Sequence, residues 1–156
     1  MHLEIERKFL VVSDEWRDAA EPTYYCQGYL NSDKNRTVRI RIAGSTAQIT
    51  IKGISTGATR AEFEYSIPME DAKQLLQLCE RPLIQKHRRK IPLNNLIWEV
   101  DEFAGENEGL VIAEVELASE DQDVKLPSWI GREVTHDAKY FNSSLVKNPY
   151  RSWKSK

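Results

Sequence analysis

The sequence predicts a single α+β domain built on a mainly antiparallel β-sheet. Its 156 residues are enough for one domain with a sizeable core. Most segments alternate apolar and charged side chains with the period of two that is typical of β-strands. Short polar turns join many of these segments, which favours hairpins, and only a few segments have helical spacing. We find no internal repeat and no interdomain linker.

Composition argues against several functional classes. The formal net charge of −2 gives no global bias toward nucleic acid or a membrane surface. We see no apolar run long enough to span a bilayer and no secretory signal. Cys26 and Cys79 lie far apart and neither belongs to a CxxC motif, so we expect neither a zinc site nor a disulfide scaffold. These features predict a cytoplasmic protein.

The first strand, residues 3–11, introduces the pattern that the later strands repeat. Its charged side chains share one face and its apolar side chains largely share the other: Glu4, Glu6 and Lys8 against Leu3, Ile5 and Phe9. Two carboxylates on one face repel each other unless a positive charge lies between them, and a divalent cation is one candidate because hard metals prefer carboxylate oxygens. The alternative is a solvated acidic face.

Four more strands follow in the first half of the chain. Ser13 is suited to cap a short helix over residues 14–20. We expect strands at 23–30, 36–42, 47–52 and 60–67, separated by turns or loops rich in polar residues and Gly.

The first convincing helix begins after Pro68, with Glu70 and Asp71 in its first turn, and ends before Pro82. An apolar stripe at helical spacing runs along it: Met69, Ala72, Leu75, Leu76 and Cys79. We interpret this stripe as core packing and not as a cofactor site.

The second half repeats the strand pattern. We expect strands at 83–92, 96–103 and 110–117, with Asn94-Asn95 as a compact hairpin turn. Residues 119–131 read as irregular, and a final helix is predicted over about 137–146. We therefore place one domain at 1–146 and expect residues 147–156 to form a basic, flexible tail.

The charged faces of these strands are segregated by sign. The acidic pairs are Glu4/Glu6, Glu62/Glu64, Glu99/Asp101 and Glu114/Glu116, and the basic set is Lys8, Arg39/Arg41, Lys52 and Lys86/Arg88. A solvated sheet face usually mixes signs, because like charges side by side are unfavourable. The pattern therefore favours a binding surface on which basic groups hold a polyanion and carboxylates hold its metal ions. An outer face of cross-strand ion pairs is the alternative.

These motifs resemble the CYTH superfamily, the triphosphate tunnel metalloenzymes, of the short bacterial type. Residues 4–8 match the family's ExExK signature, and further motifs follow in family order at 39–41, 51–53, 62–64, 86–88, 99–101 and 114–116. The segments 27–30, 134–135 and 139–142 also resemble family segments. The match covers nearly the whole chain. ExExK alone is a weak signal, but the ordered set is quite specific.

The resemblance implies an eight-stranded antiparallel β-barrel that is open at both ends. Its lumen would carry the charged faces, and helices would pack on the apolar outside. Closure of the barrel would also remove the free sheet edges.

The resemblance further implies roles for individual residues. The expected ligands of Mg²⁺ or Mn²⁺ are Glu4, Glu6, Asp101, Glu114 and Glu116. The expected triphosphate-binding residues are Lys8, Arg39, Arg41, Lys52, Lys86 and Arg88. Lys8, Lys52, Lys86, Glu62 and Glu64 are candidate catalytic residues, and Tyr29, Glu99 and Lys139 are accessory candidates.

An inorganic tripolyphosphatase is the leading functional hypothesis, because the chain has no obvious segment added for base recognition. Thiamine triphosphatase and class IV-type adenylyl cyclase are the alternatives within the family. A polyphosphate- or nucleotide-binding module without catalysis is the alternative from another class. We expect a small-molecule triphosphate as partner, neither nucleic acid nor a membrane, and a monomer or homodimer.

Overall fold

Eight antiparallel strands close into a barrel in the computed structural model, which describes residues 2–154. The strands are β1 (Leu3–Val11), β2 (Thr23–Asn31), β3 (Arg36–Ala43), β4 (Thr46–Gly53), β5 (Thr59–Ser66), β6 (Ile84–Leu93), β7 (Leu96–Phe103), β8 (Val111–Glu116) and β9 (Ile130–Glu133). The helices are α1 (Met69–Leu78) and α2 (Asn142–Lys147). Short 3₁₀ turns are η1 (Glu15–Asp18), η2 (Gly105–Asn107), η3 (Ala138–Tyr140) and η4 (Tyr150–Ser152).

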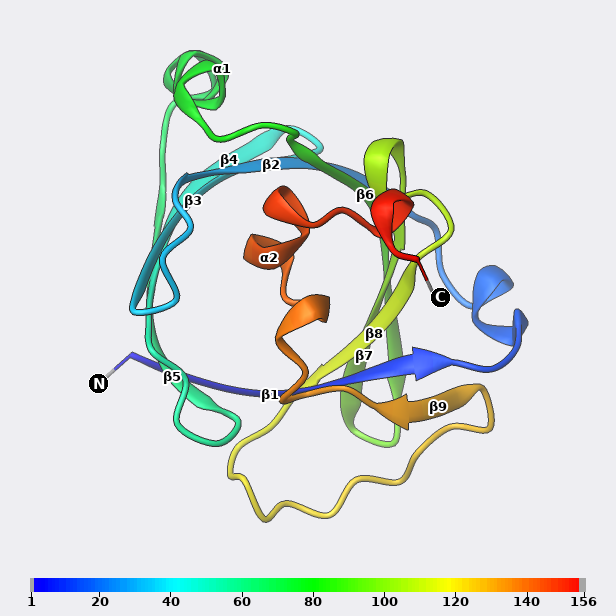
Figure 1. Cartoon of the computed structure of the whole chain (residues 1–156). Coiled ribbons are helices and arrows are strands. Elements are labelled where there is room, and N and C mark those ends of the chain that lie inside the picture. Colours follow the sequence, from blue (N-terminus) through cyan, green and yellow to red (C-terminus); the bar gives the residue numbers. More distant parts are fainter. Residues whose placement is uncertain (1, 155–156) are drawn as a thin grey trace.

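Closure of the barrel depends on a pairing between its first and fifth strands. The strand order runs β5-β4-β3-β2-β6-β7-β8-β1, and β1 returns to β5 with Leu3 opposite Ala61 and Ile5 opposite Thr59. Figure 1 looks into the resulting ring. The closed eight-stranded antiparallel barrel that the family resemblance implied is confirmed. In Figure 1, α1 and β9 lie outside the ring, whereas α2 lies within it.

The predicted strands match the observed ones within a residue or two at each end. Asn94 and Asn95 both have positive φ, as a tight type I′ hairpin turn requires, and they join β6 to β7. The predicted helix over 14–20 is only the 3₁₀ turn η1. A short strand that was not predicted, β9, begins at the end of the segment predicted to be irregular and pairs with β1 where β5 no longer borders it. Sequence periodicity gave little signal for a strand of only four residues.

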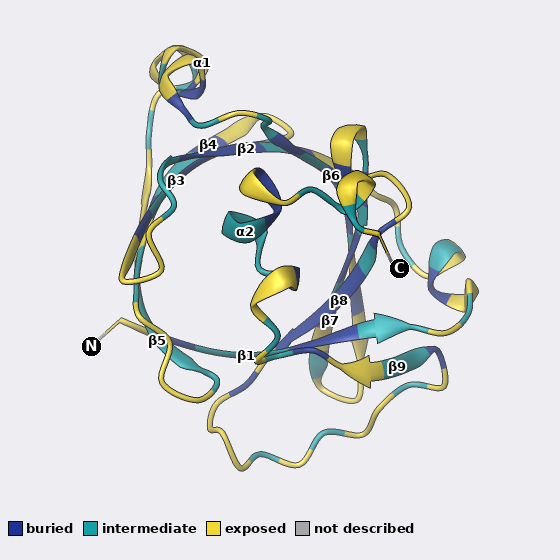
Figure 2. Cartoon of the chain, in the orientation of Figure 1, coloured by how far each residue is buried: buried dark blue, intermediate teal, exposed yellow. Residues whose placement is uncertain are grey.

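The apolar core lies mainly on the outer side of the barrel wall. Trp16 and Trp129 pack with the outward-facing Trp98, and α1 covers β2 to β4 through Ala72 and Leu76. In Figure 2, buried residues follow much of the barrel wall, whereas the connection from β8 to β9 is largely exposed. None of the helices that the structure describes is long and apolar enough to cross a membrane.

The final helix differs from its predicted form and place. Phe141 has an extended backbone, so the predicted helix is divided into η3 and α2. The helices were expected to pack only on the outside, but Phe141, Asn142 and Ser143 line the barrel cavity. Asn142 lies within hydrogen-bonding distance of Gln27 and Lys86, which also accounts for the position of α2 inside the ring in Figure 1.

The chain after α2 also makes specific contacts. The Trp153 ring packs edge-on against Tyr140 and Tyr150, and its indole N–H donates to the Asn148 carbonyl at 3.0 Å. These contacts connect residues 148–153 to the core cluster around η3. Residues 155 and 156, the last of the predicted tail, lie outside the described residues.

Candidate active site

A cavity of about 380 Å³ occupies the interior of the barrel, and residues from all eight barrel strands line it. Its charged lining comprises Glu4, Glu6, Lys8, Arg39, Arg41, Lys52, Arg60, Glu62, Glu64, Lys86, Arg88, Lys90, Glu99, Glu114 and Glu116. The period-two alternation explains this lining, because in a closed barrel one face of every strand points inward. All but three of the site residues predicted from the sequence are thus brought together.

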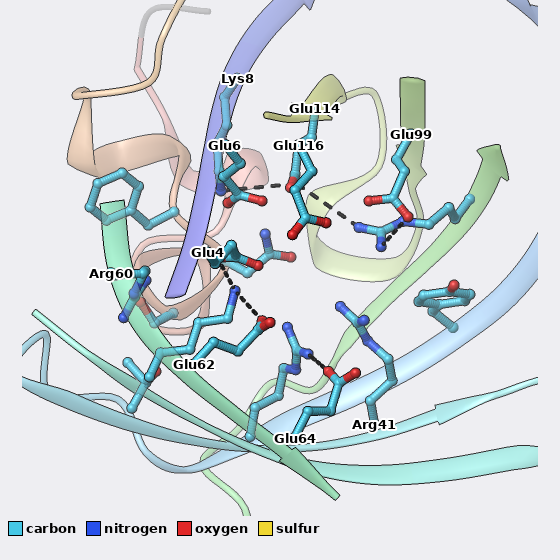
Figure 3. A pocket seen from close by; sticks show the side chains of 18 of the residues that line it. Glu4, Glu6, Lys8, Arg41, Arg60, Glu62, Glu64, Glu99, Glu114 and Glu116 are labelled. Carbon is cyan, nitrogen blue, oxygen red and sulfur yellow. Dashed lines mark hydrogen bonds and ion pairs between the residues drawn. The ribbon is translucent and has the colours of Figure 1, made fainter. Parts of the chain in front are cut away.

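Four carboxyl groups gather where β1 and β8 lie side by side. Glu6 is directly opposite Glu116 in the strand pairing, and Glu114 is opposite Lys8. Figure 3 shows Glu4, Glu6, Glu114 and Glu116 directed into the same space. This acidic cluster, as we call these four residues, is the densest concentration of negative charge that the cavity lining offers.

Two carboxyl groups in and beside the acidic cluster, Glu6 and Glu62, have raised pKa values. Burial and the neighbouring Glu114 raise the pKa of Glu6 to about 8, and the Glu6 carboxyl hydrogen-bonds to Glu114. Burial and a hydrogen bond to Glu4 raise the pKa of Glu62 to about 7. Carboxyl pKa values raised in this way indicate negative charge that the surrounding protein does not fully neutralise.

Lys52 provides part of the missing positive charge. Its Nζ lies 2.8 Å from Glu4 Oε1 and 3.4 Å from Glu62 Oε2, so the lysine links β4 to the successive strands β5 and β1 along the barrel wall. Burial disfavours the charged form of Lys52, but the attraction of Glu6 and Glu4 is stronger than this effect, so the pKa of Lys52 is raised. A cation bound at the acidic cluster would therefore compete with Lys52 for Glu4.

The chemistry of the acidic cluster fits a hard divalent cation, because all its donors are carboxylate oxygens. Within residues 2–154, however, no three acidic, His or Cys side chains converge into a ready-made coordination site. Glu6 and Glu62 have raised pKa values, so near neutral pH their carboxyl groups bind protons that a cation would replace. We conclude that the donors suit a metal ion and that binding it would displace these protons.

The strands opposite the acidic cluster, β2 and β3, and their neighbour β6 form a basic wall. Polar neighbours hold its basic side chains by hydrogen bonds. Arg39 Nη2 donates to Thr50 Oγ1 at 3.0 Å and lies 3.5 Å from Glu64 Oε2, and the Thr50 hydroxyl also donates to Glu64 at 3.0 Å. Arg39 Nε is buried and has no hydrogen-bond partner among the described residues. A buried, unpaired guanidinium N–H is suited to an anion from outside the protein.

Asp101 lies beneath this basic wall and does not line the cavity. Its carboxylate accepts from Lys86 Nζ at 2.7 Å and from Arg88 Nε and Nη2 at 2.7 and 2.8 Å, and the residue is 0% exposed. Burial opposes its charge, but Arg88 and Lys86 lower the Asp101 pKa. Burial also lowers the pKa of Lys86 to about 7, although Asp101 counteracts this effect. Both oxygens of Asp101 are therefore engaged by cations.

Two other sequence candidates lie away from the cavity. Tyr29 is buried in the core cluster beside η3, and Lys139 stacks its ammonium over Trp153 at 4.4 Å. Glu99, by contrast, lines the cavity and contacts Arg88 Nη1 at 3.2 Å. Neither Tyr29 nor Lys139 contributes to the cavity lining.

The sequence prediction missed several polar and aromatic residues of the site. Gln27 accepts from Arg41 Nε at 2.8 Å, and Asn142 lies 3.3 Å from both Gln27 Nε2 and Lys86 Nζ. Tyr25 and Phe141 also line the cavity. Gln27 is a polar residue within a largely apolar strand, and this feature of the sequence could have identified the inward face of β2.

Comparisons with known proteins agree with this geometry. Residues 2–150 match the CYTH domain. An inorganic triphosphatase of Acetivibrio thermocellus is 51% identical over 155 residues, which cover 99% of each chain. One from Nitrosomonas europaea is 36% identical over 149 residues, covering 92% of this chain and 96% of its own.

Solved structures extend the agreement to the fold. A solved inorganic triphosphatase superposes with a TM-score of 0.67 at 33% identity, covering 94% of this chain and 95% of its own. The match to the domain, the two relatives and the closed barrel with its charged lumen lead to one assignment. The chain belongs to the CYTH domain family of triphosphate tunnel metalloenzymes.

Proposed function

We propose that this protein is an inorganic triphosphatase that hydrolyses tripolyphosphate with the help of Mg²⁺ or Mn²⁺. The observation that carries the proposal is the opposition of charges in one cavity, where the acidic cluster faces a basic wall that includes Arg39 with its unpaired Nε. Two relatives described as inorganic triphosphatases, aligned over nearly the whole chain, support it.

The acidic cluster would hold the cation. Glu4, Glu6, Glu114 and Glu116 supply carboxylate oxygens, and the bound ion would add positive charge to the phosphate oxygens and lower the pKa of an attacking water. Asp101 was predicted as a further ligand. We propose instead that it is the counter-ion of Lys86 and Arg88, because both its oxygens already accept from them.

The basic residues would bind and orient the triphosphate. Lys8, Arg39, Arg41, Lys52, Lys86 and Arg88 surround the cavity and would neutralise the charge that develops on the transferred phosphoryl group. Glu62 and Glu64 would position Lys52 and Arg39, which they contact at 3.4 and 3.5 Å. These contacts would hold the substrate for in-line attack by water.

The direct test is phosphate release from tripolyphosphate, thiamine triphosphate, ATP and GTP, each with Mg²⁺ or Mn²⁺. We expect kcat/KM for tripolyphosphate to exceed the others by at least about tenfold, and excess EDTA to abolish turnover. Cyclic AMP formation from ATP would support a cyclase. Tight binding of tripolyphosphate without turnover would support a binding module without catalysis.

The raised pKa of Glu6 predicts how the stability of the metal-free protein depends on pH. The pKa of Glu6 is about 8 in the folded state and about 4.3 in the unfolded state. The folded state therefore binds the extra proton, and this stabilisation is lost as the pH rises through about 8. Glu6→Gln removes this dependence.

Thermal melts in EDTA between pH 6 and 9 measure this effect. From pH 6 to 9, we expect the Tm of the wild type to fall by roughly 5 °C more than that of Glu6→Gln. Glu21→Gln, at an exposed position, should follow the wild type. If Glu6→Gln and the wild type have parallel Tm profiles, the assignment of a raised pKa to Glu6 is wrong.

A further inference from the structure

Tyr25 stands out in the cavity because three cations surround its ring. The ring centroid lies 4.8 Å from Arg41 Cζ, 5.0 Å from Arg88 Cζ and 6.0 Å from Lys86 Nζ. Tyr25 is a buried residue of β2, and it lines the same cavity as the two arginines. The face of an aromatic ring is negative and attracts cations at these distances.

The strand register explains this arrangement. β2 lies between β3 and β6, with Tyr25 opposite Ala43 on one side and opposite Lys86 on the other. Arg41 precedes Ala43 by two residues and Arg88 follows Lys86 by two, so both arginines are on the inward face, diagonal to Tyr25. One ring thus contacts cations from both neighbouring strands.

Arg41 is held in place by a hydrogen bond to an uncharged side chain. Its Nε donates to Gln27 at 2.8 Å, and within residues 2–154 no carboxylate lies at ion-pair distance from it. Burial and the nearby cations Arg39 and Arg88 disfavour the charged form of Arg41 and lower its pKa to about 9. A carboxylate partner would compete with phosphate for the guanidinium N–H groups. A ring that contacts the guanidinium plane leaves those groups available.

We infer that Tyr25 is a positioning residue for the triphosphate, whose ring holds Arg41 and Arg88 side by side as one phosphate-binding pair. This inference rests on the proposed function and deepens it by naming what positions two of the substrate-binding arginines. The other aromatic ring that lines the cavity, Phe141, faces Lys8 Nζ at 5.6 Å. Both aromatic side chains of the described lining thus lie within cation–π distance of basic groups.

Calorimetric binding of an unreactive imido analogue of tripolyphosphate, with Mg²⁺, tests this role. Tyr25→Leu keeps an apolar side chain but removes the ring, and we expect its Kd to rise about tenfold. Tyr25→Phe keeps the ring and should change Kd less than threefold. Tyr24→Leu alters the neighbouring exposed tyrosine, and its Kd should equal that of the wild type. The affinity for Mg²⁺ alone should be the same in all of them.

Two further measurements separate positioning from folding. Fluorinated phenylalanines introduced at position 25 keep the shape of the ring and weaken its negative face, so Kd should rise with each added fluorine. Arg41→Gln should raise Kd less in the Tyr25→Leu background than in the wild type, because the two residues act together.

Three results would overturn the inference: an unchanged Kd in Tyr25→Leu, no trend with fluorination, or fully additive effects of Tyr25→Leu and Arg41→Gln. Hydrolysis of tripolyphosphate by the wild type is measured in parallel. If the wild type does not hydrolyse it, the proposed function fails. If the wild type does so and position 25 has no effect on Kd, only the role of Tyr25 is rejected.

Discussion

Glu116→Gln is expected to reduce kcat/KM for tripolyphosphate at least about 100-fold while the barrel stays folded. Within the described chain, no Lys or Arg lies at ion-pair distance from Glu116, so its carboxylate is available to a metal ion. Burial and the nearby Glu4 and Glu99 raise its pKa, which indicates that this negative charge is not compensated. Glutamine keeps the size of the side chain and removes that charge.

Initial rates across a range of Mg²⁺ concentrations measure this loss. Because the variant lacks one ligand, we expect it to need more Mg²⁺ for its remaining activity, and its Tm without metal should equal or exceed that of the wild type. Glu108→Gln, at an exposed position, is the matched control and should retain full activity. Normal rates and an unchanged Mg²⁺ requirement in Glu116→Gln would reject Glu116 as a metal ligand.

Asp101→Asn is expected to destabilise the protein by about 3 kcal/mol, which corresponds to a fall in Tm of roughly 10 °C. The Asp101 carboxylate is fully buried and accepts from Lys86 and Arg88 at 2.7–2.8 Å. Asparagine removes the one carboxylate at ion-pair distance from Lys86 among the described residues, and it leaves Arg88 with Glu99 at 3.2 Å in place of its closest partner. Because these cations would also lose their fixed positions, we expect a higher KM for tripolyphosphate.

Urea unfolding and a metal titration distinguish the two roles considered for Asp101. As the counter-ion of the basic wall, it should affect stability and KM but leave the affinity for Mg²⁺ unchanged. Glu102→Gln is a control on the same strand, because Glu102 pairs with Arg17 and Arg89 in a more exposed setting, where the loss should be below about 1 kcal/mol. A large loss of Mg²⁺ affinity in Asp101→Asn would restore Asp101 as a metal ligand.

Local patterns in the sequence determined much of the barrel wall and its lining. Alternation with period two placed Glu4 and Glu6 on one face of β1 and Arg39 and Arg41 on one face of β3, and those faces line the cavity. The pair Asn94-Asn95 predicted the β6–β7 turn, because few residues tolerate positive φ at two successive positions. These patterns can be read from the sequence because they depend only on residues that are close together along the chain.

The partners that charged side chains find on other strands and segments followed only from the tertiary structure. Glu99 and Asp101 share a face of β7, yet Glu99 lines the cavity, while Asp101 lies beneath Lys86 and Arg88. The alternation of residues along a strand determines on which face a side chain lies. It does not determine whether cations from the neighbouring strand cover that side chain. The position of Asn142 in the cavity likewise depends on contacts with Gln27 and Lys86, which are distant in sequence.

The sequence by itself therefore determined the inward face of most strands, the segregation of charge and the resemblance to triphosphate tunnel enzymes. The tertiary structure decided that the sheet closes, because closure needs β1 to pair with β5 some 55 residues away, with Leu3 opposite Ala61. It also brought Tyr25 between Arg41 and Arg88. The physical reason is that strand periodicity is encoded locally, whereas ion pairs and ring contacts form between side chains that only the closed barrel brings together.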